Sequence, residues 1–160
     1  MPPHIIGKAL TVVEVPGLTV KELIGNASTQ QDTLSVAHET ISAPSTEPWK
    51  TNQFDEWLHV VKGKIDIMHS GDQTITVNAG ETCYVVKGER YRPLFPQAGT
   101  EFIAICSPAF KPERCVREDE GSFGVSDQSQ GPPKVLADGY PDAIFHMSEK
   151  SPWEAALAAG

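Results

Sequence analysis

Short runs of alternating apolar and polar residues, separated by turn residues, dominate the first two thirds of this chain. In residues 56–62, Glu56, Leu58 and Val60 share one face and the residues between them share the other, which is the two-residue period of a β-strand. Similar runs occupy residues 10–15, 18–24, 33–41, 64–68, 74–77, 83–86 and 101–106. A tight hairpin at Ser70, Gly71 and Asp72 separates two of them. Many short strands with no helical period between them predict an antiparallel barrel or sandwich.

The length of 160 residues allows one hydrophobic core and leaves little room for a second. We therefore expect one β-barrel domain over residues 1–125, including the N-terminal strands, and a C-terminal extension over residues 126–160. Near the end, Ser151, Pro152 and Glu154 form the pattern of a helix N-terminus ahead of an alanine-rich run. This pattern predicts a short helix over residues 152–159.

The composition limits the kinds of partner that the chain can have. A formal net charge of −8 argues against nucleic acid, because binding to phosphates draws most of its affinity from clustered Lys and Arg. No apolar run has the length of a membrane span, and the N-terminal residues lack the pattern of a secretory signal. We expect a cytoplasmic protein without a membrane partner. Three cysteines without a CxxC spacing indicate neither a disulfide framework nor a structural zinc site.

Two segments resemble the motifs of the cupin superfamily. The first motif reads G(X)5HXH(X)3,4E(X)6G, and Glu56 and Gly63 fit its glutamate and last glycine. Its two histidine positions hold Trp49 and Thr51, or Lys50 and Asn52 with the shorter spacing. The second motif reads G(X)5PXG(X)2H(X)3N. Here Gly80, Gly88 and Tyr91 fall on its glycine, glycine and histidine positions, Val86 replaces the proline and Phe95 the asparagine.

The likeness spans about residues 54–110 and is greatest to histidine-depleted cupins similar to the ethanolamine-utilisation protein EutQ. It implies an all-β fold, a single cupin-type antiparallel β-barrel or jelly roll. Of the four usual metal ligands of the family, this chain keeps only the glutamate. Transition-metal sites of this kind draw mainly on imidazole, so we expect no metal and no other cofactor.

The strand period and the resemblance together place a pocket inside the barrel. Glu56 points inward in the motif, and we expect it to be a catalytic residue together with Tyr91, because an inward carboxylate on an apolar strand is costly unless it has a role. Trp49 and Thr51 in the histidine positions, together with Cys83, complete the expected pocket as substrate-binding residues. His38, on the run 33–41, is the one histidine that could also reach the interior.

We expect a small-molecule enzyme that uses metal-independent acid–base chemistry, as an isomerase, lyase or cyclase. A non-catalytic cupin that binds a small molecule is the alternative, and a metal-dependent oxygenase with atypical ligands is a third possibility. Cupin barrels commonly pair, and residues 5–15 could add a strand to a neighbour, so we also expect a homodimer.

Overall fold

The computed structural model describes residues 1–70, 73–118 and 121–122 of the chain. Almost all of the regular structure in this part is β-strand, with one short 3-10 helix, η1, at Pro112–Arg114. The expected turn residues Gly71 and Asp72, the helix over residues 152–159 and the extension over residues 126–160 lie outside the described residues. The expected division at residue 125 therefore stays a prediction.

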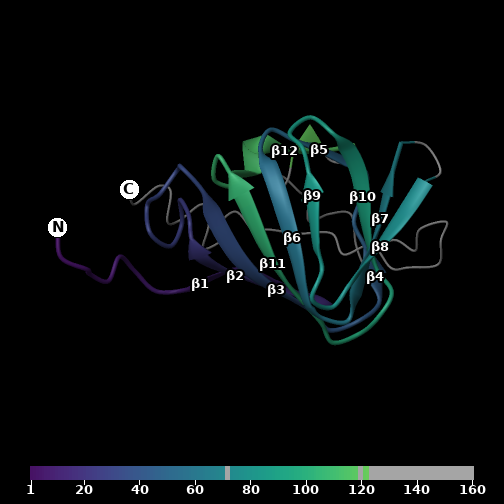
Figure 1. Cartoon of the computed structure of the whole chain (residues 1–160), viewed down its shortest axis with the longest axis horizontal. Coiled ribbons are helices and arrows are strands. Elements are labelled where there is room, and N and C mark those ends of the chain that lie inside the picture. Colours follow the sequence, from purple (N-terminus) through teal and green to yellow (C-terminus); the bar gives the residue numbers. More distant parts are fainter. Residues whose placement is uncertain (71–72, 119–120, 123–160) are drawn as a thin grey trace.

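The strands form two antiparallel sheets (Figure 1). The first has the order β1-β2-β3-β11-β6-β9, with β1 at Leu10–Val15, β2 at Leu18–Ile24, β3 at Ser35–Ile41, β6 at Asp55–Lys62, β9 at Thr82–Val85 and β11 at Thr100–Ser107. The second has the order β13-β12-β5-β10-β7-β8, with β5 at Lys50–Asn52, β7 at Lys64–His69, β8 at Gln73–Asn78, β10 at Arg90–Phe95, β12 at Cys115–Arg117 and β13 at Gly121–Ser122. Strand β4, at Ser45–Thr46, pairs with β10 outside this path. This arrangement is an antiparallel jelly roll, as the sequence predicts.

All eight alternating runs of the sequence are strands of the structure. Strand β6 shows why: Glu56, Leu58 and Val60 are buried and the residues between them are not. The core lies between the sheets and includes Leu58, Val60, Ile65 and Phe102. Burying apolar faces of this kind stabilises the fold by roughly 1.5–3 kcal/mol for each large side chain.

The structure adds strand β10, which the alternation did not predict. Pro93 lies within it and lacks the N–H that a strand interior normally donates, so the residue argues against a strand. The carbonyl oxygen of Pro93 still accepts hydrogen bonds from the backbone N–H of Glu47, at 3.1 Å, and from Thr46 Oγ1, at 2.9 Å. The chain around β4 thus bonds to β10 through the carbonyl group of the proline, and Thr46 lies opposite Leu94.

Gly63 makes the turn between β6 and β7, where the chain passes from one sheet to the other. Its φ of +79° lies in the left-handed region, and a Cβ at this position would come within 2.3 Å of Thr100 Oγ1. The glycine position of the cupin motif is thus explained by backbone conformation and by close packing.

Candidate active site

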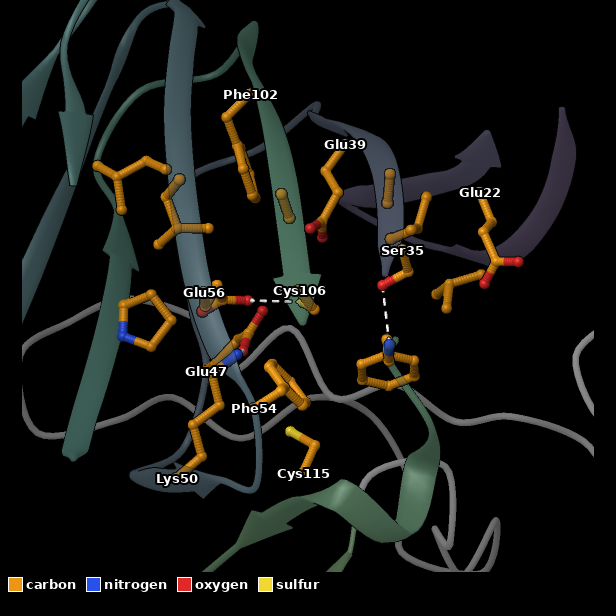
Figure 2. A pocket seen from close by; sticks show the side chains of 18 of the residues that line it. Glu22, Ser35, Glu39, Glu47, Lys50, Phe54, Glu56, Phe102, Cys106 and Cys115 are labelled. Atoms are coloured by element: carbon orange, nitrogen blue, oxygen red, sulfur yellow. Dashed lines mark hydrogen bonds and ion pairs between the residues drawn. The ribbon is translucent and has the colours of Figure 1, made fainter. Parts of the chain in front are cut away.

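A cavity of about 80 Å³ lies between the two sheets, measured as the space open to the centre of a water molecule. One water takes roughly 10–15 Å³ of such space, so there is room for several waters or for a small organic molecule. Apolar side chains form most of the wall, among them Val13, Val20, Ile65 and Phe102. Figure 2 shows that charged and polar side chains also line this largely apolar space.

Glu56 lies at the centre of the polar groups and has two hydrogen-bond donors. The hydroxyl of Tyr91 donates to Oε1 of Glu56, and the Cys106 thiol donates to Oε2 at an Sγ to oxygen distance of 3.7 Å. Nδ2 of Asn52 donates to the Tyr91 hydroxyl oxygen at 3.1 Å. Asn52, Tyr91 and Glu56 therefore form a directed chain of hydrogen bonds that ends on the carboxylate.

Burial raises the pKa values of both Glu56 and Tyr91. It raises the pKa of Glu56, although the Lys50 ammonium and the Tyr91 hydroxyl act to lower it. Burial, followed by the nearby Glu56 charge, raises the pKa of Tyr91 well above its usual value. Tyr91 therefore stays a hydroxyl donor, and Glu56 is more basic than an exposed carboxylate.

Lys50 and Glu47 form a largely buried ion pair on the same wall. Lys50 Nζ lies 2.6 Å from Oε2 of Glu47 and 5.3 Å from the ring centroid of Tyr91. Burial is the largest single influence and acts to lower the pKa of Lys50, but the acidic groups around it, Glu47 first among them, together outweigh burial and hold this pKa well above its usual value. The amine therefore stays an ammonium and supplies the positive charge of the cavity.

Glu39 reaches the cavity from β3, in the same sheet as Glu56. Burial, followed by the nearby charges of Glu47 and Glu56, raises the pKa of this carboxyl to about 8. Among the described residues, no hydrogen bond to its side chain and no ion pair with it is present. Glu39 is therefore mainly a neutral carboxylic acid at pH 7.

The structure brings Glu56 and Tyr91 together, as expected, but the two histidine positions of the first motif are held by Lys50 and Asn52. Tyr91 pairs directly with Lys50 across β10 and β5, and directly opposed residues share a face, so Lys50 faces inward with Tyr91. Thr51 is one position away and does not line the cavity. Trp49 does not line it either; its ring stacks 4.0 Å from the Arg90 guanidinium carbon.

Two further expected site residues also lie outside the cavity lining. Cys83 is buried, but it lies in the part of the core bordered by β8 and β9 rather than among the cavity residues. His38 belongs to β3 but does not line the cavity, because its neighbours Ala37 and Glu39 take the inward positions. The expectation that Trp49, Thr51, Cys83 and His38 form the pocket is not met by their positions, whereas Glu56 and Tyr91 remain candidates for the chemistry.

Several cavity residues were not predicted from the sequence, among them Glu39, Glu47, Cys106 and Cys115. Glu39 follows His38 on a strand whose apolar and polar residues do not alternate clearly. The sequence therefore did not show whether the side chain of Glu39 points inward or outward. Glu47 precedes a proline in a segment without alternation. The alternation of β11 could have placed Cys106 inward, since Phe102, Ala104 and Cys106 are spaced two apart.

The residues present do not fit the metal of the cupin motif. Its histidine positions hold Lys50, Asn52 and Tyr91, and the ammonium of Lys50 would repel a cation. Within residues 1–70, 73–118 and 121–122, no group of three or more His, Cys, Asp or Glu side chains is placed to hold a metal ion. In the same part of the chain, no helix is both long and apolar enough to cross a membrane.

No protein family model matches the sequence. A curated relative, the endoribonuclease YbeY of Myxococcus xanthus, is 33% identical over 99 residues, which are 61% of this chain and 33% of that protein. The chain thus spans about a third of the length of the curated relative that it matches.

Solved structures match over more of the chain, at low identity. Oxalate decarboxylase from Bacillus subtilis covers 74% of this chain and 34% of its own, with 12% identity and a TM-score of 0.59. An RmlC-like cupin from Shewanella frigidimarina covers 63% and 86%, with 18% identity and a TM-score of 0.53. The EutQ protein of Clostridium difficile also matches, over 57% of this chain and 63% of its own, with 20% identity and a TM-score of 0.46. Two antiparallel sheets around an inward Glu56, together with the first two matches, show that this chain has the fold of the RmlC-like cupins.

Proposed function

We propose that this protein is a small-molecule enzyme that catalyses proton transfer in the barrel cavity without a metal, in an isomerase, lyase or cyclase type of reaction. The observation that carries the proposal is the hydrogen-bonded pair of Glu56 and Tyr91 facing an apolar cavity beside the Lys50 ammonium. A buried carboxylate of raised pKa with a fixed hydroxyl donor is a typical acid–base arrangement.

Each group has a role that follows from its position. Glu56 takes a proton from a carbon atom next to a carbonyl group of the substrate, and the electron pair of the broken C–H bond moves toward the carbonyl oxygen. The Tyr91 hydroxyl donates its proton to Oε1 of Glu56 and so holds the carboxylate in place. The Lys50 ammonium acts to lower the pKa of Glu56 and so favours the ionised form that can accept a proton.

The proposal can be tested before the natural substrate is known. Purified protein in EDTA is incubated in D2O with a panel of small aldehydes, ketones and hydroxy acids, and loss of C–H signal is followed by proton NMR. Glu56→Gln should fold and should lower the exchange rate roughly 10²–10⁴-fold. Tyr91→Phe should lower the exchange rate less, because the phenylalanine ring still fills the space that the tyrosine ring occupies in the cavity wall.

Glu101→Gln is the matched control, since it makes the same chemical change on β11 at a position that does not line the cavity. It should leave the rate unchanged. Full exchange activity in Glu56→Gln would show that the acid–base assignment is wrong.

A binding protein is the second candidate, and one observation favours it. Both oxygens of Glu56 already accept hydrogen bonds and Lys50 is already paired, so the polar groups are satisfied within the protein. A binding protein would take up a ligand without any exchange, and both Glu56→Gln and Tyr91→Phe would weaken that binding. An enzyme would still bind substrate in Glu56→Gln while turnover falls.

The name of the curated relative does not guide the proposal. The match covers a third of that endoribonuclease, and the formal net charge of −8 on this chain disfavours a polyanionic partner.

A further inference from the structure

Glu39 is the polar cavity residue that the proposed chemistry leaves without a role. Its carboxyl group lines the cavity among apolar side chains such as Val20 and Phe102. A carboxyl in such a place costs several kcal/mol when nothing pairs with it, whether it stays ionised or takes up a proton. No hydrogen bond or ion pair to it is present within the described part of the chain, so the fold itself gains nothing from this group.

The two carboxyls approach the cavity from strands separated by one other strand. Strand β11 lies between β3 and β6, which puts the backbones of the two outer strands about 10 Å apart. Along β11, Glu39 is opposite Phe102 and Glu56 is opposite Cys106, an offset of four residues or about 13 Å. The two carboxyls therefore face one cavity from different levels, and a small molecule can lie between them (Figure 2).

We propose that Glu39 is the second proton-transfer group of the site and that the substrate is a small carbonyl or β-hydroxy carbonyl compound held between Glu39 and Glu56. This inference depends on the function proposed above. Proton abstraction at the α-carbon leaves charge on the oxygen of the adjacent carbonyl group, and a second group on another wall can protonate that oxygen as the charge forms.

The proton balance of the step closes within the site. Glu56 takes the proton from the α-carbon, the C–H electron pair forms the C=C bond, and the carbonyl π pair moves to the oxygen. That oxygen takes the proton of Glu39, which gives an enol, a protonated Glu56 and an ionised Glu39. When the α-carbon carries a hydroxyl, Glu56 returns its proton to the former carbonyl carbon, the α-hydroxyl gives its proton to Glu39, and the freed O–H pair forms the new C=O bond, which completes an isomerisation. When the β-carbon carries a hydroxyl, the enol proton first returns to Glu39 as the C=O bond re-forms. The C=C pair then expels the β-hydroxyl, which takes the Glu39 proton and leaves as water, and this gives an elimination.

The surroundings of Glu39 suit the role of an acid near neutral pH. Its charged and titratable neighbours around the cavity are Glu22 on β2, Glu47, Lys50, Glu56 on β6, Tyr91 on β10, Cys106 on β11 and Cys115 on β12. Glu22 is turned to the loop after β2, where it accepts hydrogen bonds from the N–H groups of Ala27 and Ser28. With burial as the largest cause and the charges of Glu47 and Glu56 next, the pKa of Glu39 of about 8 leaves a proton available for transfer.

The test is the pH profile of the deuterium exchange reaction, measured between pH 5 and 10 with a carbonyl probe from the panel. Wild-type exchange should fall above about pH 8, where Glu39 loses its proton. Glu39→Gln should lower kcat at least 10-fold and should abolish this fall, because an amide has no proton to give. Glu39→Asp should be slow but keep the alkaline fall, which a purely structural role would not predict.

Glu101→Gln serves again as the control and should keep both the rate and the profile. If Glu56→Gln is impaired but Glu39→Gln keeps the wild-type rate and the alkaline fall, Glu39 has no part in the reaction while the proposed function stands. If the wild-type protein exchanges no probe of the panel, the proposed function fails and the inference fails with it. Circular dichroism of each variant shows whether a lost rate reflects a lost fold, and Glu39→Asp then decides the question.

Discussion

Replacing Glu39 by glutamine also tests the electrostatics of the cavity without any substrate. Burial raises the pKa of this carboxyl from 4.5 to about 8, so the folded protein holds the proton more tightly than the unfolded chain. Between these two pH values the unfolded chain has lost the proton and the folded protein has kept it. Folding stability contributed by this group is therefore present at low pH, falls as the pH rises from about 4.5 to about 8, and is constant above that.

The size of the effect follows from the same difference in pKa. Each pH unit corresponds to about 1.36 kcal/mol, so a rise from 4.5 to about 8 sets an upper limit of ~5 kcal/mol. Glu39 is only partly buried, and water in the cavity screens part of this penalty. We expect the stability of Glu39→Gln relative to wild type to increase by ~2–4 kcal/mol between pH 5 and pH 9.

Urea unfolding of both proteins, followed by tryptophan fluorescence and by circular dichroism, measures this difference. Other groups with raised pKa values, such as Glu56, are present in both proteins and largely cancel in the comparison. A stability difference that stays constant within ~0.5 kcal/mol from pH 5 to pH 9 would refute the reasoning, because Glu39 would then titrate alike in the folded and unfolded chains.

Three further predictions address metal, assembly and the ion pair. Purified protein should carry substoichiometric transition metal, and elemental analysis that finds about one metal per chain, lost in Glu56→Gln, would contradict this. The chain should be a homodimer, in which residues 5–15, with Ile5 91% exposed, add to a neighbour; light scattering that reports a monomer at micromolar concentration would count against it. Lys50→Met should cost roughly 3–5 kcal/mol of stability because it leaves Glu47 buried without its ammonium, and adding Glu47→Gln should restore most of the loss. A cost below ~1 kcal/mol for the single change would show that the pair is not desolvated.

The fold was predictable because strand alternation is a local property that burial enforces. Glu56, Leu58 and Val60 lie on the inner face of β6 as the period requires, and a shift of one residue would place all three in solvent. Strand β10 escaped prediction because Pro93 carries a local signal against strand that tertiary pairing overrides.

The site was predictable only where a residue lies on a strand with a clear period or fixed motif spacing. Tyr91 and Glu56 meet these conditions, and the structure joins them by a hydrogen bond. The segment before Glu56 has two allowed spacings in the motif, so sequence alone could not decide between Thr51 and its neighbours Lys50 and Asn52. Cross-strand pairing with β10 decides it, and pairing partners cannot be read from one sequence.

Lys50 gives a physical reason why a barrel of this kind can do without its metal. A cupin metal places positive charge next to the inward glutamate, which favours the ionised carboxylate. In this chain the Lys50 ammonium, at a histidine position of the motif, acts on Glu56 in the same direction. Lys50 is itself held charged by Glu47, so its ammonium cannot be lost near neutral pH. The cavity thus keeps a fixed positive charge beside its carboxylate, which is the arrangement that the proposed proton transfer uses.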